Sequence, residues 1–402
     1  MLGKMNKLLV TGVFAFCFIS SGLADIKTTI NGSIDSQVVN IKEKGTFKKL
    51  DDYRKASDND IITDAYLKFG MNGTVDSGLR YGAMIKLNAN TLKSKKEIFT
   101  DTKSSIAEQA MIYLENEFSH VEIGSYTGIS NTMKVNAATF ASATGGINGD
   151  SQYYWNKAIS PTTSTGNPIE TIFLQTPNLP TNELGTIGIK GMNATKINYY
   201  TPEFSGFRFG ISYISDAKVY GTIASANSVF RDEDGFKNVF ETGLSCIGEV
   251  KNIGIKFAMV SEFGKNKVST KKDLRTWEVG KNLTYHGFTV GGSYGNWGKY
   301  KAPKTGINKY AGTSYWTMGI GYAYGPLSAS ITHLQSKKGM EANQKANTLR
   351  NTVLGVDYKI VAGLLSYLEF SSFKMNDKST TEPQDNKSNK GHIFMFGMKL
   401  KF

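Results

Sequence analysis

The last twelve residues of the chain, GHIFMFGMKLKF, alternate between two kinds of side chain. Large apolar residues occupy every second position at Phe394, Phe396, Met398, Leu400 and Phe402, and two lysines are among the residues between them. Successive side chains of a β-strand point to opposite faces, so a period of two indicates a strand. We therefore predict that the chain ends in a strand with one apolar face.

The same alternation recurs along the chain, for example in LRYGAMIKLNAN from Leu79. We predict sixteen strands, which begin near Thr28, Ile61, Leu79, Glu108, His120, Thr195, Phe207, Val239, Ile253, Leu274, Phe288, Ser314, Leu327, Thr348, Leu364 and His392. Seven connections between them are short and rich in turn residues, and eight longer polar connections alternate strictly with the short ones. An up-and-down barrel with short turns at one rim, large loops at the other and both termini at the short-turn rim produces this order. A jelly roll or an immunoglobulin-like sandwich does not.

The apolar face of such a barrel must point outward. Sixteen strands enclose a lumen too wide for side chains to fill, so an inward apolar face would line water. Aromatic residues fall near the predicted strand ends, as the interfacial girdles of a membrane barrel require, at Tyr199, Tyr213, Tyr285, Tyr294, Tyr324, Tyr358 and Phe402. All eight prolines lie in connections. The expected fold class is all-β, an antiparallel transmembrane barrel.

The amino-terminal segment predicts export. Residues 1–24 combine a basic start, a short apolar run and a small-residue end at Ala24, the pattern of a cleaved signal peptide. Cleavage would leave residues 25–402 as the barrel and lower the formal charge from +13 to +11, because the leader carries two lysines and no acid. Cys246 would be the one remaining cysteine, so no intrachain disulfide can form.

The chain shows no recognisable catalytic or cofactor motif. Its four histidines have neither metal-ligand spacing nor a neighbouring nucleophile elbow, so we predict neither an enzyme nor a cofactor or metal site. A Ser-His or Asp-His pair across neighbouring strands stays open as an alternative. The lysines are dispersed along the chain, which argues against nucleic-acid binding. A mainly structural or adhesive surface protein is a second alternative, because large loops suit adhesion.

Several stretches resemble the general porins of Gram-negative outer membranes, the trimeric sixteen-stranded type that includes alphaproteobacterial members. They are LKFGMNGTVDSGLRYG, NYYTPEFSGFRFGISY, LGVDYKIVAGLLSYLEF and the ending GMKLKF, and the resemblance covers essentially the whole mature chain. It implies an outer-membrane homotrimer with short periplasmic turns, long extracellular loops and passive diffusion of small hydrophilic solutes and ions. It also implies contacts with membrane lipid and lipopolysaccharide, and an assembly machinery that reads the terminal aromatic, Phe402.

The longest connection, residues 128–192, corresponds to the third loop of that family, which folds into the lumen and narrows it. It contains ATFASATGGINGDSQYYW, whose Gly145, Gly146 and Gly149 would let the backbone turn tightly against the wall. Asp150 would present a carboxylate to the pore, and Glu170 and Glu183 are the other acidic candidates. A flexible surface loop is the alternative.

With the apolar face outward, the predicted lumen face receives nine cations and seven anions. The cations are Lys68, Arg80, Lys86, Lys196, Arg208, Lys256, Lys359, Lys399 and Lys401. The anions are Asp35, Glu115, Glu122, Glu241, Glu278, Asp357 and Glu369. Only charges at the narrowest section should bias permeation strongly, because the Debye length is about 8 Å at physiological salt.

We expect Lys68, Arg80 and Lys86 to lie close together, because in the resembled family a basic cluster on this part of the wall faces the acidic loop. The predicted constriction residues are Lys68, Arg80, Lys86, Asp150, Arg208 and Glu122, and the predicted pore leans weakly towards anions. The alternatives are that these cations pair with wall carboxylates or bind lipopolysaccharide near the rim. Lys281 falls on the outward face of its strand, which predicts a bulge or a snorkelling side chain.

Overall fold

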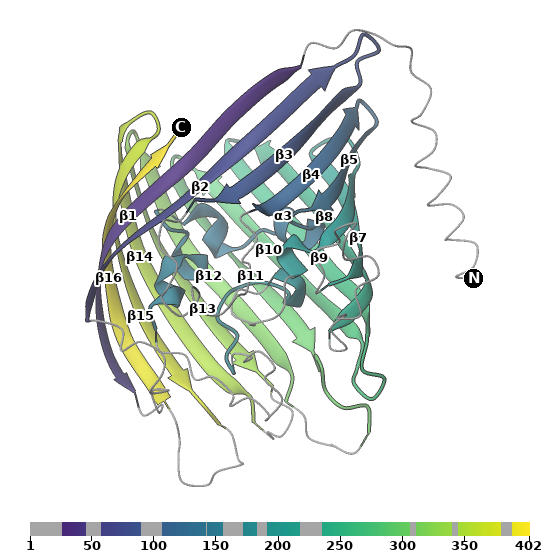
Figure 1. The fold of residues 1–402 in the computed structure, drawn as a ribbon. Coiled ribbons are helices and arrows are strands. Elements are labelled where there is room, and N and C mark those ends of the chain that lie inside the picture. The colour runs from purple at the N-terminus through teal and green to yellow at the C-terminus, as the bar shows by residue number, and fades with distance from the viewer. Residues whose placement is uncertain are drawn as a thin grey trace, which may run out of the picture.

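The computed structural model describes residues 26–45, 58–89, 107–141, 143–155, 172–182, 191–217, 235–305, 311–339, 345–378 and 388–402. In these residues sixteen strands form one closed antiparallel barrel, in which each strand pairs with its neighbours in sequence and β1 pairs with β16 (Figure 1). The prediction of this fold class is confirmed. The leader, residues 1–24, lies outside the described residues.

Every strand begins within four residues of its predicted start. The strands are β1 Lys27–Gly45, β2 Asn59–Thr74, β3 Arg80–Asn88, β4 Ala107–Asn116, β5 Ser119–Ser125, β6 Thr195–Tyr200, β7 Phe207–Asp216, β8 Phe236–Val250, β9 Ile253–Asn266, β10 Leu274–Tyr285, β11 Phe288–Gly298, β12 Thr313–Tyr324, β13 Leu327–Lys338, β14 Asn347–Val361, β15 Leu364–Asn376 and β16 Ser388–Lys401. The short turns and the carboxyl terminus share one rim (Figure 1).

Residues with positive φ angles form the tightest turns at this rim. His286 and Gly287, with φ angles of 45° and 83°, join β10 to β11. Lys251 and Asn252, with φ angles of 48° and 64°, join β8 to β9. Two consecutive left-handed residues give the turn twist that matches a hairpin of right-twisted strands. Both connections therefore hold adjacent strands in a fixed register.

The last residue closes the barrel seam. The amide of Phe402 donates to the carbonyl of Gly32 over 3.2 Å, and the amide of Gly32 donates to the carbonyl of Phe402 over 2.9 Å. A β-carbon at Gly32 would lie 2.6 Å from the Phe402 ring, so the ring occupies the space that a side chain at this position would need. Closure removes the free edges that an open sheet would expose.

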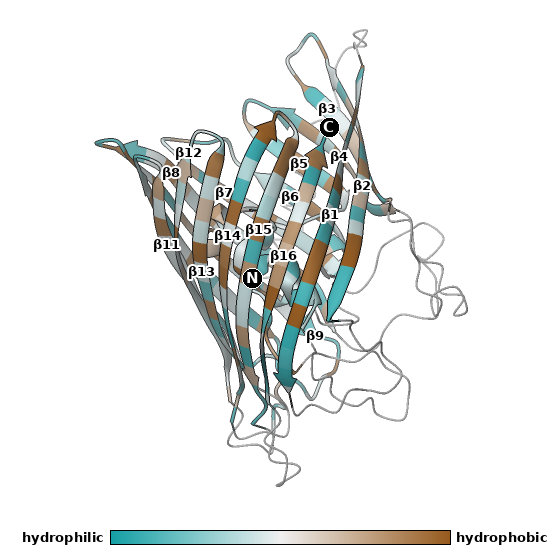
Figure 2. Cartoon of the chain, turned by 90° about the vertical axis from the view of Figure 1, so that its left-hand side faces the viewer, coloured by the Kyte–Doolittle hydropathy of each residue, from teal (hydrophilic) through white to brown (hydrophobic). Residues whose placement is uncertain are grey.

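The outer wall is apolar through its middle, and hydrophobic and hydrophilic residues alternate along the strands in Figure 2. Leu354, Phe394 and Phe396 are each nearly half exposed on this face. Lys281 is also exposed there, opposite Phe257 on β9 and Gly292 on β11 in continuous registers. The outward position predicted for Lys281 is confirmed, and of the two predicted outcomes the bulge is absent, which leaves a side chain that extends towards the interface.

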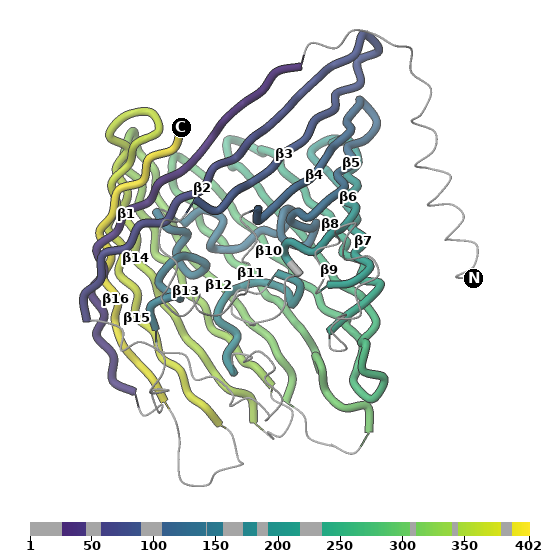
Figure 3. The backbone as a smooth tube through the Cα atoms, in the orientation of Figure 1, coloured from purple at the N-terminus to yellow at the C-terminus, as the bar shows by residue number. Residues whose placement is uncertain are grey.

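Residues 126–194, which we call the inner loop, connect β5 to β6, and the described residues of this loop lie inside the barrel (Figure 3). Its described part contains six short helical segments: α3 Ile129–Thr132, η1 Ala137–Phe140, η2 Gly146–Asn148, η3 Asp150–Tyr153, η4 Pro180–Asn182 and η5 Gly191–Asn193. None of the helices in the described residues is long and apolar enough to cross a bilayer.

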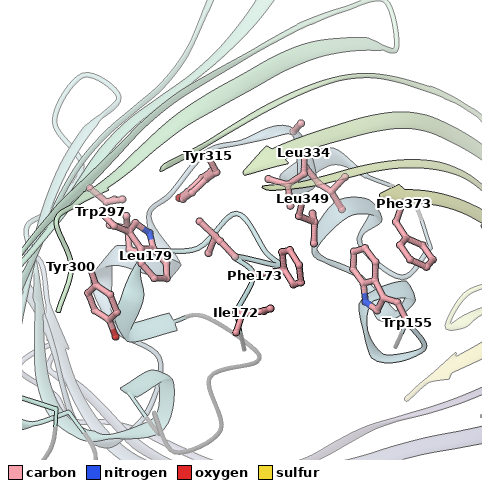
Figure 4. Packing of buried hydrophobic residues seen from close by; sticks show 14 of the residues in the cluster. Trp155, Ile172, Phe173, Leu179, Trp297, Tyr300, Tyr315, Leu334, Leu349 and Phe373 are labelled. Atoms are coloured by element: carbon pink, nitrogen blue, oxygen red, sulfur yellow. The ribbon is translucent and has the colours of Figure 1, made fainter. Parts of the chain in front are cut away.

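The hydrophobic core of the molecule lies between the inner loop and the inner face of the wall (Figure 4). Trp155 packs edge-on against Phe373 of β15, with ring centroids 4.9 Å apart. Trp297 of β11 donates its indole N–H to the carbonyl of Asn178 over 3.1 Å. Phe173 is completely buried. These contacts hold the loop against one side of the barrel, from β11 to β15.

Candidate functional site

The inner loop begins by binding two adjacent carboxylates of the wall. Glu241 of β8 and Glu262 of β9 are direct register partners, and both are fully buried. The amide of Ser130 donates to Glu241 Oε2 over 3.0 Å, and the Ser130 hydroxyl donates to Glu262 Oε1 over 2.9 Å. Gly128 makes this approach possible, because a β-carbon there would overlap Glu241 Oε2.

The returning part of the loop binds the same two carboxylates. The amide of Thr181 donates to Glu262 Oε2 over 3.2 Å, and the Thr181 hydroxyl lies 3.0 Å from Glu241 Oε1. The Asn182 amide group donates to the Ser130 hydroxyl over 2.6 Å, which links the two ends of the loop. Buried carboxylates need such donors, because an unpaired buried charge is strongly unfavourable. The acid pair is therefore the main polar attachment of the loop.

Two further wall acids hold the middle of the loop. Glu278 of β10 accepts a hydrogen bond from Asn136 over 3.2 Å, and Glu369 of β15 accepts one from Thr144 over 2.6 Å. Each is 1% exposed. The sequence placed Glu241, Glu278 and Glu369 on the lumen face but missed Glu262. The signal was present, because Glu262 shares the parity of the inward residue Lys256 on the same strand.

After Gly145 and Gly146 the loop reaches β1, the first strand of the barrel. These glycines have φ angles of 111° and 61°, and a β-carbon at Gly146 would lie 2.7 Å from the Thr332 hydroxyl of β13. Asp150 then accepts a hydrogen bond from Gln37 of β1 over 3.0 Å. Burial raises the pKa of Asp150 above its ordinary value, and the Gln37 hydrogen bond partly opposes this shift. The alternative of a flexible surface loop is therefore excluded for this stretch.

Lys134 is the one cation of the described loop segments. It donates a hydrogen bond to the side-chain oxygen of Asn178. Burial lowers the pKa of Lys134 to about 8, although the nearby carboxylates Glu278 and Glu262 favour its charged form. The loop therefore carries a lysine that loses its charge under mildly alkaline conditions.

Lys68 and Lys86 lie on the side of the barrel formed by β2 and β3. They are direct register partners. Lys86 forms a 2.7 Å ion pair with Glu108 and lies 4.7 Å from the centroid of the Tyr66 ring. Like charges opposite each other on a sheet repel, and the carboxylate and the ring reduce that repulsion.

The structure does not bring Arg80 to this pair. Arg80 begins β3 at the short-turn rim, six residues from Lys86, which corresponds to about 20 Å along a strand. It forms a 2.7 Å ion pair with Glu115 instead. Both Arg80 and Lys86 therefore pair with carboxylates of the wall, which is one of the alternatives predicted for these cations. Lys68, Arg80 and Lys86 therefore do not form one compact basic cluster, because β3 leads away from the short-turn rim and separates Arg80 from Lys86 along the pore.

Arg208 and Glu122 belong to a second group of side chains on β5 to β7. The Arg208 guanidinium lies 4.6 Å from the centroid of the Tyr200 ring. Glu122 accepts a hydrogen bond from Asn198 over 2.8 Å and lies 3.1 Å from a ring nitrogen of His120. The other candidate acids of the loop, Glu170 and Glu183, lie outside the described residues.

The acidic side chains of the lumen face are less accessible than the basic ones. Five of the seven predicted anions are less than a tenth exposed: Asp35, Glu122, Glu241, Glu278 and Glu369. Of the nine predicted cations, Lys196 is the one that is buried to this extent. The acids that the alternation directs inward are therefore mostly covered, whereas the cations mostly remain accessible.

The histidines lie in four separate places. His120 is on the inner face of β5, His286 is in a turn, and His333 and His392 are on the outer faces of β13 and β16. Among the described residues, no group of three or more His, Cys, Asp or Glu side chains could hold a metal ion.

Comparisons with known proteins agree with this architecture. The sequence profile of the family described as Gram-negative porin matches residues 12–378. An uncharacterized protein of Rickettsia bellii (strain RML369-C) is 26% identical and aligns with 99% of this chain and its own full length. The uncharacterized protein RT0064 of Rickettsia typhi is 25% identical with the same coverage.

Two solved structures share the fold. The anion-selective porin from Comamonas acidovorans is 16% identical, with a TM-score of 0.58, and covers 94% of this chain and 100% of its own. The trimer form of OmpT, an outer membrane protein of Vibrio cholerae, is 12% identical, with a TM-score of 0.53, and covers 94% of this chain and 99% of its own. At these identities the likeness shows the fold alone.

Proposed function

This chain belongs to the Gram-negative porin family of outer-membrane channels, and on that premise we propose that it passes small hydrophilic solutes and ions by passive diffusion with a weak preference for anions. It crosses the outer membrane with its strands, the short turns facing the periplasm and the long loops facing outward. The proposal assigns it transport and no catalysis.

The covering of the wall acids is the observation that supports the anion preference. Glu241, Glu262, Glu278 and Glu369 are bound by loop groups and are at most 1% exposed. Lys68, Lys86 and Lys256 on the same inner face remain accessible. Permeating ions respond mainly to the charges that line their water-filled path at close range. A lumen whose acids are buried beneath the loop should therefore favour anions.

We assign Lys68 and Lys86 to the wall of the constriction and Asp150 to the loop side. Arg80, Arg208 and Glu122 line the periplasmic part of the pore in this proposal. Because Glu108 pairs with Lys86 and Gln37 binds Asp150, each of these charges is partly compensated, so the preference should be weak.

Reversal potentials across a KCl gradient in planar bilayers test the assignment. The Lys68→Glu, Lys86→Glu double variant should shift the potential towards cation selectivity. The matched control, Lys42→Glu, Lys44→Glu, carries the same charge change on the outer wall and should leave it unchanged. Equal potentials for both double variants would show that β2 and β3 do not line the narrow section. If the folded wild-type protein shows no conductance, an adhesive or structural role is favoured instead.

We also propose that Phe402 is the residue that the outer-membrane assembly machinery reads. It is 54% exposed at the periplasmic rim, where a machinery could bind it before closure. Phe402→Ser should lower the amount of heat-modifiable protein in the outer membrane of cells but not its refolding in detergent. Equal losses in both would reduce its role to closing the seam.

A homotrimer is the third part of the proposal, and the strand lengths support it. β5 and β6 have seven and six residues, against 15, 13 and 14 in β14 to β16. A strand of this length, tilted by about 40°, rises about 18 Å, which is less than the apolar band of about 25 Å. The outer faces of β4 to β6 still expose Ile112, Ile123 and Ile197. A neighbouring protomer would cover this low part of the wall.

A further inference from the structure

One cation from each of four adjacent strands lies in a single row on the outer wall. In the register of the barrel, Lys44 of β1 is opposite Lys390 of β16, Lys390 is opposite Lys374 of β15, and Lys374 is opposite Arg350 of β14. All four side chains are exposed. We call these four residues the outer basic row. Neighbouring strands are about 4.8 Å apart, so the row is about 14 Å long.

The row faces the membrane and not the pore. Its immediate chain neighbours Leu349, Met375 and Asn389 are buried on the inner face, and side chains alternate along a strand. Four residues closer to the periplasm, the same outer face carries Leu354, Phe370 and Phe394 in one register row. That distance is about 13 Å along a strand. The cations therefore lie on the extracellular side of the apolar band.

The residues between these two rows are polar. Thr352, Ser372, His392 and Lys42 form the intermediate register row. They mark a gradual change from hydrocarbon to water, as at the headgroup level of a bilayer. Long lysine and arginine side chains can also extend from this height towards the polar interface.

Within the described part of the chain, no carboxylate forms an ion pair with the outer basic row. The outward positions of β1, β14, β15 and β16 contain neither Asp nor Glu in the described residues, and the row forms no ion pair there. Elsewhere on this rim cations do pair, for Lys265 binds Asp273 over 2.7 Å and Lys267 binds Asp216 over 2.6 Å. Like charges directly opposite each other on a sheet are destabilising. An anionic partner would remove that repulsion.

We propose that the outer basic row binds the phosphate groups of a lipid in the outer leaflet. Arg and Lys form strong charge-assisted hydrogen bonds with phosphate, and a cation near an anionic membrane surface contributes about 1 kcal/mol. A row about 14 Å long can reach more than one phosphate group, and the lipid chains would lie over Leu354, Phe370 and Phe394. The inference rests on the outer-membrane location of the protein and is independent of ion selectivity.

The test compares two triple variants with the same loss of charge. Arg350→Gln, Lys374→Gln, Lys390→Gln removes most of the row. Lys237→Gln, Lys265→Gln, Arg275→Gln removes three exposed cations at the same rim of β8 to β10. Binding of bisphosphorylated lipid A in nonionic detergent micelles is measured by native mass spectrometry. Each removed cation should weaken the binding of lipid A about fivefold, so the first variant should bind it about 100-fold more weakly than the wild type. The second should stay within about threefold of wild type, because a distant wall leaves the row intact.

Two further arms identify the ligand chemistry. We call Arg350→Gln, Lys374→Gln, Lys390→Gln the row variant. Dephosphorylated lipid A should bind the wild type as weakly as bisphosphorylated lipid A binds the row variant. Free inorganic phosphate should not displace bisphosphorylated lipid A from the wild type. Unchanged binding by the row variant, or equal losses in both triple variants, would overturn the proposal. Displacement by inorganic phosphate would overturn the assignment to a lipid. Both variants should keep the heat-modifiable barrel and wild-type conductance, which separates failure of this inference from failure of the channel itself.

Discussion

Gly128 is the residue whose lack of a side chain allows the inner loop to reach the wall carboxylates. Gly128→Ala would push Glu241 away from the Ser130 amide. Leaving the buried Ser130 amide without its acceptor costs about 1–3 kcal/mol, so amide exchange of residues 128–133 should accelerate about 5- to 150-fold. Gly248→Ala on β8 is the control, because no atom lies within 4 Å of its added β-carbon. Equal exchange in both variants would show that the contact at Gly128 does not hold the loop.

Asp150 should make the selectivity of the pore depend on pH. Burial raises the pKa of Asp150, so this carboxyl gains a proton at a higher pH than a free aspartate as the solution is acidified. The lumen then loses a negative charge, and the anion preference should increase.

Reversal potentials at neutral and acidic pH measure this effect. Asp150→Asn should already be more anion-selective than wild type at neutral pH and should change less on acidification. Glu203→Gln, in an exposed periplasmic turn, should behave like wild type. A pH response that is identical in Asp150→Asn and wild type would place Asp150 outside the narrow section.

Single residues also show where sequence reasoning reaches its limit. Alternation assigns Glu241 to the lumen face correctly, but it does not reveal that the loop then buries this carboxylate. The positions of Arg80 and Lys86 six residues apart are explicit in the sequence. Their separation on the wall follows only when strand direction is considered together with spacing. Partners such as Gln37 and Asp150 are 113 residues apart, and no local pattern connects them.

At the scale of elements, the inner loop is held by one acid pair at both of its ends. Replacing Glu241 and Glu262 by Ala removes the acceptors of Ser130 and Thr181 together. The loop should then detach from β8 and β9, and the single-channel current should become noisier, with additional conductance levels. Glu241→Gln, Glu262→Gln is the matched control, because each amide keeps an acceptor oxygen at nearly the same volume. Steady single-level currents in the alanine variant would show that the apolar contacts alone fix the loop.

The strands were predictable, whereas the interior of the loop was not. Along each strand, side chains that face the membrane alternate with side chains that face the lumen or the inner loop, so a period of two fixes the position of the strand within a few residues. The loop has no such period. Phe173, Trp155 and Leu179 are buried against Trp297, Tyr315 and Phe373, which come from three different strands far along the chain. Only the closed barrel brings these partners together.

At the scale of the whole molecule, the low wall of β4 to β6 should be the contact between protomers. In a Cys246→Ser background, Ile123→Cys should form cross-links between protomers, because this outward residue would lie within the covered region. Leu354→Cys, on the outer face of the longer strand β14, should form no cross-links between protomers. The native detergent complex should have three times the mass of one chain. A monomeric complex, or cross-linking at position 354 alone, would contradict this arrangement.

The most direct test of the central claim is the reversal potential of the unmodified, folded protein in a planar bilayer across a KCl gradient. Because the inner loop buries the wall acids Glu241, Glu262, Glu278 and Glu369, chloride should be moderately more permeant than potassium. The reversal potential should therefore have the sign of the chloride equilibrium potential, and its magnitude should remain well below that of an ideally chloride-selective pore. A potential with the sign of potassium would contradict this account of the lumen, and folded protein without discrete conductance would contradict the channel itself.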